Sequence, residues 1–372
     1  FWPATMYIEG LDQYRGWFQS SLLVAVGALG RGAPFKECVT HGWTVDGEGK
    51  AMHKSLGNGM DPAEIFDKYG ADLLRLWAGS ADYHVDVRCS DEIFKQLSQN
   101  YLKFRNTCKF CLDNLVGFDA DHLVQPDEML PLDKWAVTRL NTLIEKVFAA
   151  YDNYEFHVVS HMVNDFCVVD LSSFYFDIIK DRLYCGEENS LERRSAQSAV
   201  WMILDAMTRL FAPILAFTCD EVWLAMPHRA GDDARNVLLN QMVQPYAAYA
   251  LSEEEMGKWA RLAALRTAVN GALEQARADK TIGKSLEAEV DLTVTAEDAF
   301  LTDMDAADLA DLLIVSQVRV EVGAELTVAV RPANGAKCLR CWKVLPTVGS
   351  DAGHPDLCPR CAAVVKNLPV IE

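Results

Sequence analysis

The most extended pattern in this sequence is a series of apolar residues at helical spacing between residues 132 and 280. One such stripe consists of Trp135, Leu140, Leu143, Ile144, Val147 and Phe148. Positions at this spacing share one face of a helix with 3.6 residues per turn. Further helices are expected at residues 156–184, 196–215, 217–226 and 253–280. Nearly the whole stretch is therefore predicted to be helical, as a bundle.

The residues on both sides of this stretch mix short strands with helices. Before it, strands are expected at residues 6–8 and 38–45, and helices at 22–29, from 70 onwards and at 91–115. Residues 117–131 contain Pro and Asp and predict a domain boundary. After the bundle, strands are expected at residues 289–295, 317–322 and 325–330, with a helix at 299–314. The predicted fold class is multidomain, α/β plus all-α, with a small α/β subdomain near the C-terminus.

Composition and charge limit the cellular location and the binding partners that can be expected for this sequence. No stretch has the length and apolarity of a membrane span and no signal peptide is recognisable, so a cytosolic protein without a membrane partner is expected. The net charge of -18 argues against nucleic-acid binding by the chain as a whole. However, residues 331–366 hold six basic residues and only two acidic ones. This asymmetry fits contact with RNA at selected patches, although a solvated tail without an RNA role remains an alternative.

Four cysteines near the C-terminus have the spacing of a metal site. The pair Cys338 and Cys341 is followed by the pair Cys358 and Cys361. Two such pairs can place four thiolates around one Zn²⁺, and this closed set predicts a structural metal. Two disulfides are the alternative. Most of the other cysteines stand singly in apolar helices, as reduced buried thiols do.

A loop bounded by glycines, residues 47–59, carries Lys54 and Ser55. Glycines allow such a loop to move and to bring an ammonium group to a phosphate chain. The loop ends at Asp61 and Pro62, which predict the start of a helix because Asp caps a helix and Pro suits its first position. An ordinary polar loop is the alternative.

A second group of candidate residues follows the strand expected at residues 6–8. Glu9 and Gly10 lie where a strand ends and a helix begins, the place where open α/β sheets bind ligands. Asp12 and Gln13 offer hydrogen-bonding groups for a ribose or an ammonium. The alternative is a helix cap at Asp12. Trp17 and Phe18, at the start of the next helix, are expected to be core residues.

Both groups resemble signatures of the class I aminoacyl-tRNA synthetases. Residues 51–55, Ala-Met-His-Lys-Ser, are similar to the Lys-Met-Ser-Lys-Ser loop of that class, with Ala51 and His53 as departures. Residues 6–21 are similar to the isoleucyl type. The resemblance implies that Lys54 binds ATP phosphates, with Ser55 beside it, and stabilises charge on pyrophosphate. It also implies that Glu9, with Gly10, Asp12 and Gln13, contacts the aminoacyl-adenylate.

The resemblance extends over nearly the whole chain and implies a domain order. It comprises the C-terminal part of a Rossmann-type catalytic domain (1–90), a connecting helix and linker (91–130), a helical anticodon-binding domain (131–285), a small α/β subdomain (286–333) and a zinc module (334–372). The implied substrates and partners are ATP with Mg²⁺, L-isoleucine and tRNA(Ile), and a monomer is expected. Lys180 and Arg182 are candidates for tRNA contact or, equally, for ion pairs.

The sequence starts at Phe1, inside a recognisable motif, and contains no His-x-Gly-His, the other class I signature. We therefore expect a C-terminal portion that lacks part of the catalytic domain and the editing domain, and that is inactive alone. A valyl or methionyl relative is one alternative. A non-catalytic RNA-binding module is another, although such a module has no use for a nucleotide loop.

Overall fold

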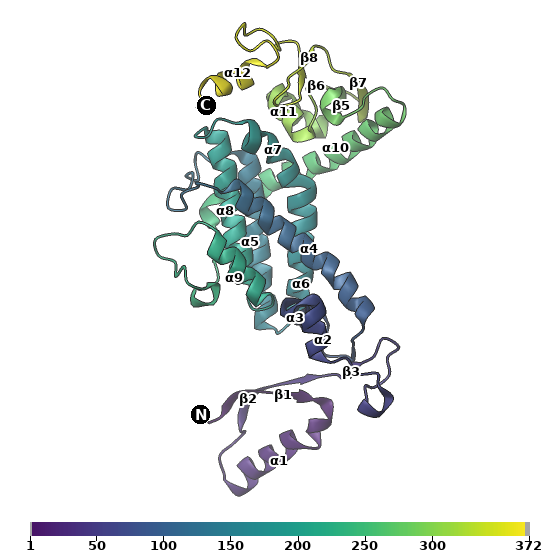
Figure 1. The fold of residues 1–372 in the computed structure, drawn as a ribbon, viewed down its shortest axis with the longest axis vertical. Helices are drawn as coiled ribbons and strands as arrows, with labels where there is room; N and C mark the ends of the chain where they lie inside the picture. Colours follow the sequence, from purple (N-terminus) through teal and green to yellow (C-terminus); the bar gives the residue numbers. More distant parts are fainter. Residues whose placement is uncertain (1, 369–372) are drawn as a thin grey trace.

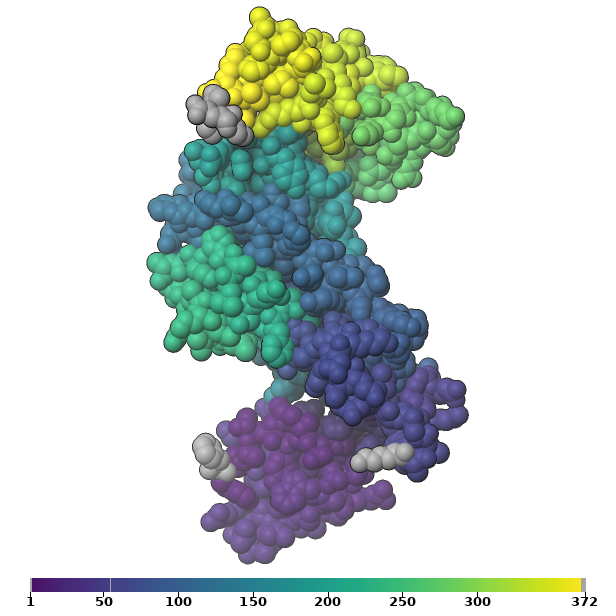
Figure 2. Space-filling view, viewed as in Figure 1, coloured from purple at the N-terminus to yellow at the C-terminus, as the bar shows by residue number. Residues whose placement is uncertain are grey.

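The computed structural model describes residues 2–368, apart from the side chain of Lys54. The molecule is elongated, with its N-terminal residues at one end and its C-terminal residues at the other (Figure 1). The space-filling view shows the same separation between the purple and yellow ends, with the helical residues between them (Figure 2). No helix among the described residues is long and apolar enough to cross a bilayer.

The N-terminal end is built on two parallel strands. β1 (Ala4–Gly10) pairs with β2 (Phe35–His41), from Ala4 opposite Phe35 to Gly10 opposite His41. Parallel strands require a crossover, and here it runs through the short helix η1 (Leu11–Tyr14), α1 (Trp17–Leu23) and the π-helical turn η2 (Val24–Ala28). The strand and helix expected here are therefore present.

The burial predicted for this end is only partly right. Phe18 is 4% exposed, as a core residue should be, but Trp17 is 57% exposed. The Trp17 ring stacks against Tyr7 at a centroid distance of 6.2 Å, which covers one of its faces. Ile8, on the strand expected to be buried, is also exposed. The reason is that Ile8 lies on a two-stranded sheet and Trp17 on the helix beside it, so few other elements are available to cover their side chains.

The candidate loop leads into two short helices. β3 (Thr44–Val45) precedes the loop, whose one helical turn is η3 (Lys54–Leu56), and α2 (Pro62–Tyr69) and α3 (Ala71–Ser80) follow. The Asp61 side chain accepts a hydrogen bond from the Ala63 amide and Pro62 occupies the first turn, which confirms the predicted helix start. β4 (Val87–Arg88) then pairs in parallel with β3.

α3 is joined tightly to the helical region. The carboxylate of Asp72 accepts hydrogen bonds from the amides of Phe217 and Thr218 and from the Thr218 hydroxyl. These amides begin α9 (Ala216–Ala225), so Asp72 satisfies free N–H groups at the start of another helix. Arg75 donates to the carbonyls of Pro213 and Ile214 just before it. The helices that follow the loop are thereby attached to the bundle.

The bundle contains the main core of the molecule. Its helices are α4 (Asp91–Asn114), α5 (Pro131–Asp152), α6 (Phe156–Asp165), the π-helical segment η4 (Phe166–Tyr175), α7 (Phe176–Cys185), α8 (Leu191–Phe211), α9 and α10 (Glu253–Ala278). Residues 115–130 form no helix or strand, as expected for the linker. The predicted stripe of α5 is largely buried, with Phe148 at its edge, and the aromatic residues 174–176 are buried as well.

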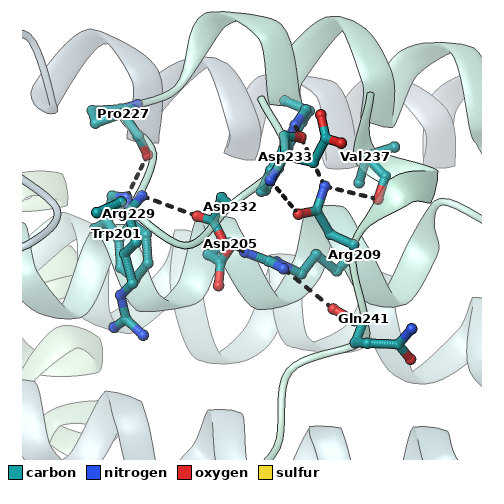
Figure 3. Close-up of polar contacts among 12 residues, drawn as sticks. Trp201, Asp205, Arg209, Pro227, Arg229, Asp232, Asp233, Val237 and Gln241 are labelled. Carbon is teal, nitrogen blue, oxygen red and sulfur yellow. Dashed lines mark hydrogen bonds and ion pairs between the residues drawn. The ribbon is translucent and has the colours of Figure 1, made fainter. Parts of the chain in front are cut away.

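The connection between α9 and α10 falls between the helices that were predicted at residues 217–226 and 253–280. Residues 227–252 hold only the short turns η5 (Val237–Leu239) and η6 (Ala247–Tyr249). Arg209 on α8 fixes this connection by donating to Asp205, to Asp232 and to the carbonyl of Gln241 (Figure 3). The Arg209 guanidinium also lies over the Trp223 ring at 4.6 Å. A half-buried arginine thus orders a segment whose residues show no periodicity.

The C-terminal end combines a small sheet with a short tail. β5 (Ala288–Val294) lies between β6 (Gln317–Val322), which is parallel to it, and β7 (Thr327–Pro332), which is antiparallel. The helix expected at 299–314 is divided into η8 (Ala296–Asp303) and α11 (Ala306–Leu313), because Asp305 caps a new helix. η7 (Ser285–Glu287) precedes this sheet, and the tail consists of β8 (Ala336–Lys337), β9 (Val344–Leu345) and α12 (Pro359–Lys366).

Candidate functional site

The glycine-bounded loop has an internal scaffold made by Asp46 and Asn58. The Asn58 amide donates to the Asp46 carboxylate at 2.9 Å and to the carbonyl of Ala51 at 3.1 Å, and its oxygen accepts from the His53 amide at 2.9 Å. Asp46 also accepts from the amides of Glu48 and Lys50. The loop is therefore closed across its base while its middle stays exposed.

These hydrogen bonds affect the ionisation of Asp46. The side-chain hydrogen bond from Asn58, followed by the backbone bond from Lys50, lowers the pKa of Asp46 below its ordinary value. Ser55 is exposed on the loop. The side chain of Lys54 lies outside the described part of the structure, so the phosphate-binding role of Lys54 remains a prediction.

Glu9 and Gly10 end β1 at the carboxyl edge of the parallel pair. Glu9 is exposed and Gly10 is buried. A Cβ at Gly10 would stand 2.9 Å from a carboxylate oxygen of Asp12, closer than real Cβ atoms come, so a side chain here would displace Asp12. Because Asp12 is exposed and the other neighbours, Trp43 and His41, lie at 3.7 and 3.9 Å, an alanine here would require a shift of the Asp12 side chain alone.

Asp12 and Gln13 contact each other beyond this strand end. The Gln13 amide donates to Asp12 at 3.0 Å, and the Gln13 oxygen accepts from the Trp17 amide at 2.9 Å. Gln13 therefore binds a free N–H at the start of α1, the role that the alternative interpretation gave to Asp12. The Asp12 carboxylate is exposed and accepts this one hydrogen bond from a side chain.

The strand that precedes the loop begins close to the edge where Glu9 and Gly10 lie. β2 runs parallel to β1 and ends at His41, opposite Gly10, and β3 begins three residues later at Thr44. β3 itself pairs with β4 in a separate sheet, and the loop follows it. The edge at Glu9 and Gly10 is where parallel sheets present ligand-binding groups.

Asp46 and Asn58 were not among the predicted site residues, although both order the loop. Asn58 stands at a position that fits the signature sequence, and Asp46 forms an Asp-Gly pair with Gly47. Such a pair favours a turn in which the Asp side chain binds amides further along the chain. That turn signal was available in the sequence, whereas the bond between Asp46 and Asn58 depends on how the loop closes.

The four cysteines of the tail come together as predicted. Their Sγ atoms all lie within 4.8 Å of one another and all four residues are buried. The Sγ atoms of Cys341 and Cys358 are 3.9 Å apart. This fits the spacing of about 3.8 Å that four Zn–S bonds of about 2.3 Å impose in a tetrahedron, and it is far too long for a disulfide. All four thiols are free, and they form a closed site for one structural zinc ion.

Backbone groups prepare this site for thiolates. Burial disfavours the charged form of Cys338, but amides around its sulfur, first that of Cys341 and then that of Cys358, outweigh burial and bring the pKa of Cys338 to about 6. Burial raises the pKa of Cys341 and of Cys358. A bound zinc ion would supply the positive charge that four neighbouring thiolates need.

Most basic residues of the tail are already paired with groups of the protein. Arg331 contacts Glu289 and Asp291, Lys343 contacts Asp311, Arg360 contacts Asp181, Lys366 contacts Asp351, and Arg340 donates to the carbonyl of Cys185. Lys337 is exposed, and no ion pair of its amine is among the described contacts. The excess of basic residues in the tail therefore gives much less free positive charge than the sequence indicates.

The two candidate tRNA contacts of α7 form ion pairs. Lys180 contacts Asp177, and Arg182 donates through two nitrogens to the fully buried carboxylate of Asp133. Tyr175 and Ser195 also donate to Asp133. Arg182 thus belongs to a buried network that joins α5, α7 and α8.

Three families match this chain. Residues 1–90 match the tRNA synthetases of class I (I, L, M and V), residues 133–292 match the anticodon-binding domain of tRNA ligase, and residues 335–364 match the zinc finger found in FPG and IleRS. Together with the strand edge, the loop and the four-cysteine site, these matches define the class. The chain belongs to the class I tRNA synthetases.

Within this class, its relatives are isoleucine–tRNA ligases. The chain is 47% identical to the enzyme of Geobacter sulfurreducens, over 98% of the chain and 40% of the relative, and 46% identical to that of Moorella thermoacetica, over 99% and 41%. The chain thus corresponds to part of an isoleucine–tRNA ligase. It spans about 40% of the length of these curated relatives.

Solved structures of other members share the fold. The LeuRS of Agrobacterium radiobacter K84, in a ternary complex with tRNA and LeuAMS, superposes with a TM-score of 0.50 over 90% of this chain and 33% of its own, at 17% identity. The methionyl-tRNA synthetase of Mycobacterium tuberculosis, bound to methionyl-adenylate, gives 0.51 over 60% of this chain and 44% of its own, also at 17% identity. At this identity the likeness concerns the fold alone.

Proposed function

We propose that the whole protein to which this chain belongs activates L-isoleucine with ATP·Mg²⁺ and esterifies the product to tRNA(Ile), as a monomer in the cytoplasm. The observation that carries the proposal is the alignment with isoleucine–tRNA ligases at 46–47% identity over nearly the whole chain. The methionyl-tRNA synthetase reported above shares the fold at 17% identity, well below the identity to the isoleucine–tRNA ligases.

The strand edge would hold the adenylate. The carboxylates of Glu9 and Asp12 and the amide of Gln13 are placed at the carboxyl end of β1, where Gly10 lets the Asp12 carboxylate lie close to the backbone. Exposed carboxylates at this edge suit the ammonium of an amino acid and the hydroxyls of a ribose. Their task would be positioning, which lowers the entropic cost of bringing the amino acid to ATP.

The loop would act on the phosphates. In adenylate formation the amino-acid carboxylate attacks the α-phosphorus, the bond to the bridging oxygen breaks and pyrophosphate leaves with additional negative charge. Lys54 would stabilise that charge, with Ser55 as a second donor, so that this part of catalysis is electrostatic. The scaffold of Asp46 and Asn58 supports this role because it fixes the base of the loop while His53 and residues 55–57 stay exposed.

The remaining segments would serve tRNA. We propose residues 1–90 as catalytic, 91–130 as the connection, 131–285 as the anticodon-binding domain, 286–333 as a small α/β subdomain and 334–372 as the zinc module. The matches to an anticodon-binding domain and to a zinc finger support the helical and zinc assignments. The bonds of Asp72 and Arg75 would hold the helices after the loop on the domain that binds tRNA.

The test uses the full-length enzyme. Isoleucine-dependent exchange of pyrophosphate into ATP should exceed exchange with valine or methionine, and tRNA(Ile) should be charged. The 372-residue chain alone serves as a control, and we expect no exchange above background because it lacks the His-x-Gly-His signature. Equal exchange with methionine or valine would refute the assigned substrate, and exchange by the chain alone would refute the expected need for the remaining catalytic residues.

A further inference from the structure

The zinc module, defined here as residues 334–368, lies against the end of α7. Each Cys-x-x-Cys pair encloses one arginine, Arg340 in the first and Arg360 in the second. Arg360 donates to both carboxylate oxygens of Asp181, at 2.5 and 2.9 Å. Arg340 donates to the carbonyl of Cys185 at 2.5 Å. Both Cys-x-x-Cys turns of the zinc site, called knuckles below, therefore bind the same helix.

The Asp181 carboxylate and the Cys185 carbonyl are both favourable partners for an arginine. Asp181 and Cys185 are four residues apart and lie on one face of α7. Cys185 is the last residue of α7, so its carbonyl has no partner within the helix and lies at the negative end of the helix dipole. A cation placed here is stabilised by both effects. The bidentate contact of Arg360 with a carboxylate adds a geometry that lysine cannot reproduce.

Other contacts extend the same interface. Lys343, which is 9% exposed, contacts Asp311 on α11. Ser316 accepts from the Val344 amide at 2.7 Å, and Asn367 donates to Glu187 just beyond α7. The Cys185 side chain is buried beside the four ligand cysteines, and its thiol lies 3.6 Å from the Arg340 carbonyl. The module thus packs against the junction between α7 and the small α/β subdomain.

We propose that the end of α7 is a docking surface for the zinc module of the same chain, and that zinc binding and docking form one coupled equilibrium. The metal would hold the two knuckles in the one relative position that lets Arg340 and Arg360 bind together. With both arginines on one rigid unit, the second contact forms at a high effective concentration. Without the metal, each knuckle would have to be ordered separately at an entropic cost. The basic residues of the module would then act as internal partners for acidic helix ends.

The buried thiol of Cys185 provides a readout that needs no catalytic activity. Cys38 is exposed and would react under all conditions, so the test uses the full chain with Cys38→Ser. Alkylation of Cys185 by a maleimide, located by peptide mass spectrometry, should be slow with zinc bound. After removal of zinc by a chelator it should be faster by at least on the order of tenfold, as for a locally opened segment. Circular dichroism should meanwhile show that the bundle keeps its helices.

A substitution outside the ligand set separates docking from metal binding. In Arg360→Ala the four cysteines remain, so zinc content should stay near that of the parent while alkylation of Cys185 rises. The exchange Arg360→Asp with Asp181→Arg should restore protection. Arg105→Ala, which removes an exposed arginine of α4, is the matched control and should change neither property.

Three results would overturn the proposal. They are unchanged protection of Cys185 in Arg360→Ala, unchanged protection after zinc removal, and exposure of Cys185 in the charge-exchanged variant equal to that in Arg360→Ala. If Arg360→Ala does not fold, zinc removal from the parent chain still decides the question. These measurements involve neither isoleucine nor tRNA, so their failure would leave the proposed function untouched.

Discussion

The N-terminal end and the helical bundle differ most clearly in how they bury their helices. Of the 21 residues of α8, 16 are buried, whereas of the 7 residues of α1 only Phe18 is buried. Leu23, Val24, Val26 and Leu29 in and after α1 are all more than half exposed. The bundle thus supplies its own core, while the sheet edge with the candidate adenylate residues contributes little burial to stability. The residues proposed for the chemistry and most of the buried core therefore lie in different regions of this chain.

The largest expected effect tests this contrast directly. Leu140→Ala on α5 removes a fully buried side chain and should lower the free energy of unfolding by about 2–5 kcal/mol, because it loses apolar burial and leaves a cavity. Leu23→Ala on α1 removes a leucine that is 62% exposed and should change it by less than about 0.5 kcal/mol. Urea denaturation followed by circular dichroism measures both. Comparable losses would show that α1 belongs to the same cooperative core.

A second prediction concerns a residue that should affect the rate of adenylate formation without affecting the stability of the fold. In the full-length enzyme, Lys54→Ala should slow adenylate formation by on the order of 3 kcal/mol in activation free energy, with a much smaller change in isoleucine binding. The reason is that negative charge on the leaving pyrophosphate develops only in the transition state. Single-turnover measurement of adenylate formation checks this, and the urea midpoint should not move.

His53→Ser is the matched control for the loop. Serine is the residue of the signature sequence at this position, so the effect should be small. An unchanged rate in Lys54→Ala would reduce Lys54 to an ordinary loop residue, and a large effect of His53→Ser would mean that the departure from the signature matters.

The two regions also differ in how far the sequence predicted them. The helices of the bundle were predictable because burial on one side imposes a 3.6-residue period, and the zinc ligands because two knuckles of fixed spacing suffice to surround a metal. The exposure of Trp17 was not predictable, because an aromatic residue at the start of a helix is buried only if other elements pack over it. The pattern along the chain carries no information on that.

Charge partners were the other feature that the sequence did not reveal. Arg360 and Asp181 are 179 residues apart, and Lys343 and Asp311 belong to different elements. Counting basic residues in the tail therefore predicted a free basic surface, whereas the fold neutralises most of it. Asp72 shows the same limitation, because its partners on α9 lie more than 140 positions along the chain.

A third prediction concerns the hydrogen bonds by which Asp72 on α3 attaches the N-terminal end to α9 of the bundle. Asp72→Ala should lower the free energy of unfolding by about 1–2 kcal/mol, as the loss of a helix cap does, because the amides of Phe217 and Thr218 lose their acceptor and that of Thr218 stays buried. Asp72→Asn keeps an acceptor and should recover part of this loss. Asp67→Ala, on the exposed surface of α2, is the control. An effect of Asp72→Ala no larger than that of the control would mean that these hydrogen bonds contribute nothing to stability.

The smallest effect on global stability is expected at the loop scaffold. Asn58→Ala removes the hydrogen bonds to Asp46, Ala51 and His53, yet the loop is exposed, so the urea midpoint should remain within the range of about 0.5 kcal/mol typical of surface changes. Locally, hydrogen exchange of the amides of Glu48, Lys50 and His53 should accelerate, because each is now bonded to Asp46 or Asn58. Low pH should also loosen the loop scaffold. The pKa of Asp46 is lowered in the folded loop, so the scaffold is fully present above the ordinary carboxyl pKa of 3.8 and weakens as the pH falls below it.

In the full-length enzyme, the looser loop of Asn58→Ala should slow adenylate formation less than Lys54→Ala does, since it disorders the lysine without removing its charge. Faster exchange together with an unchanged rate of adenylate formation would separate the order of the loop from its chemistry.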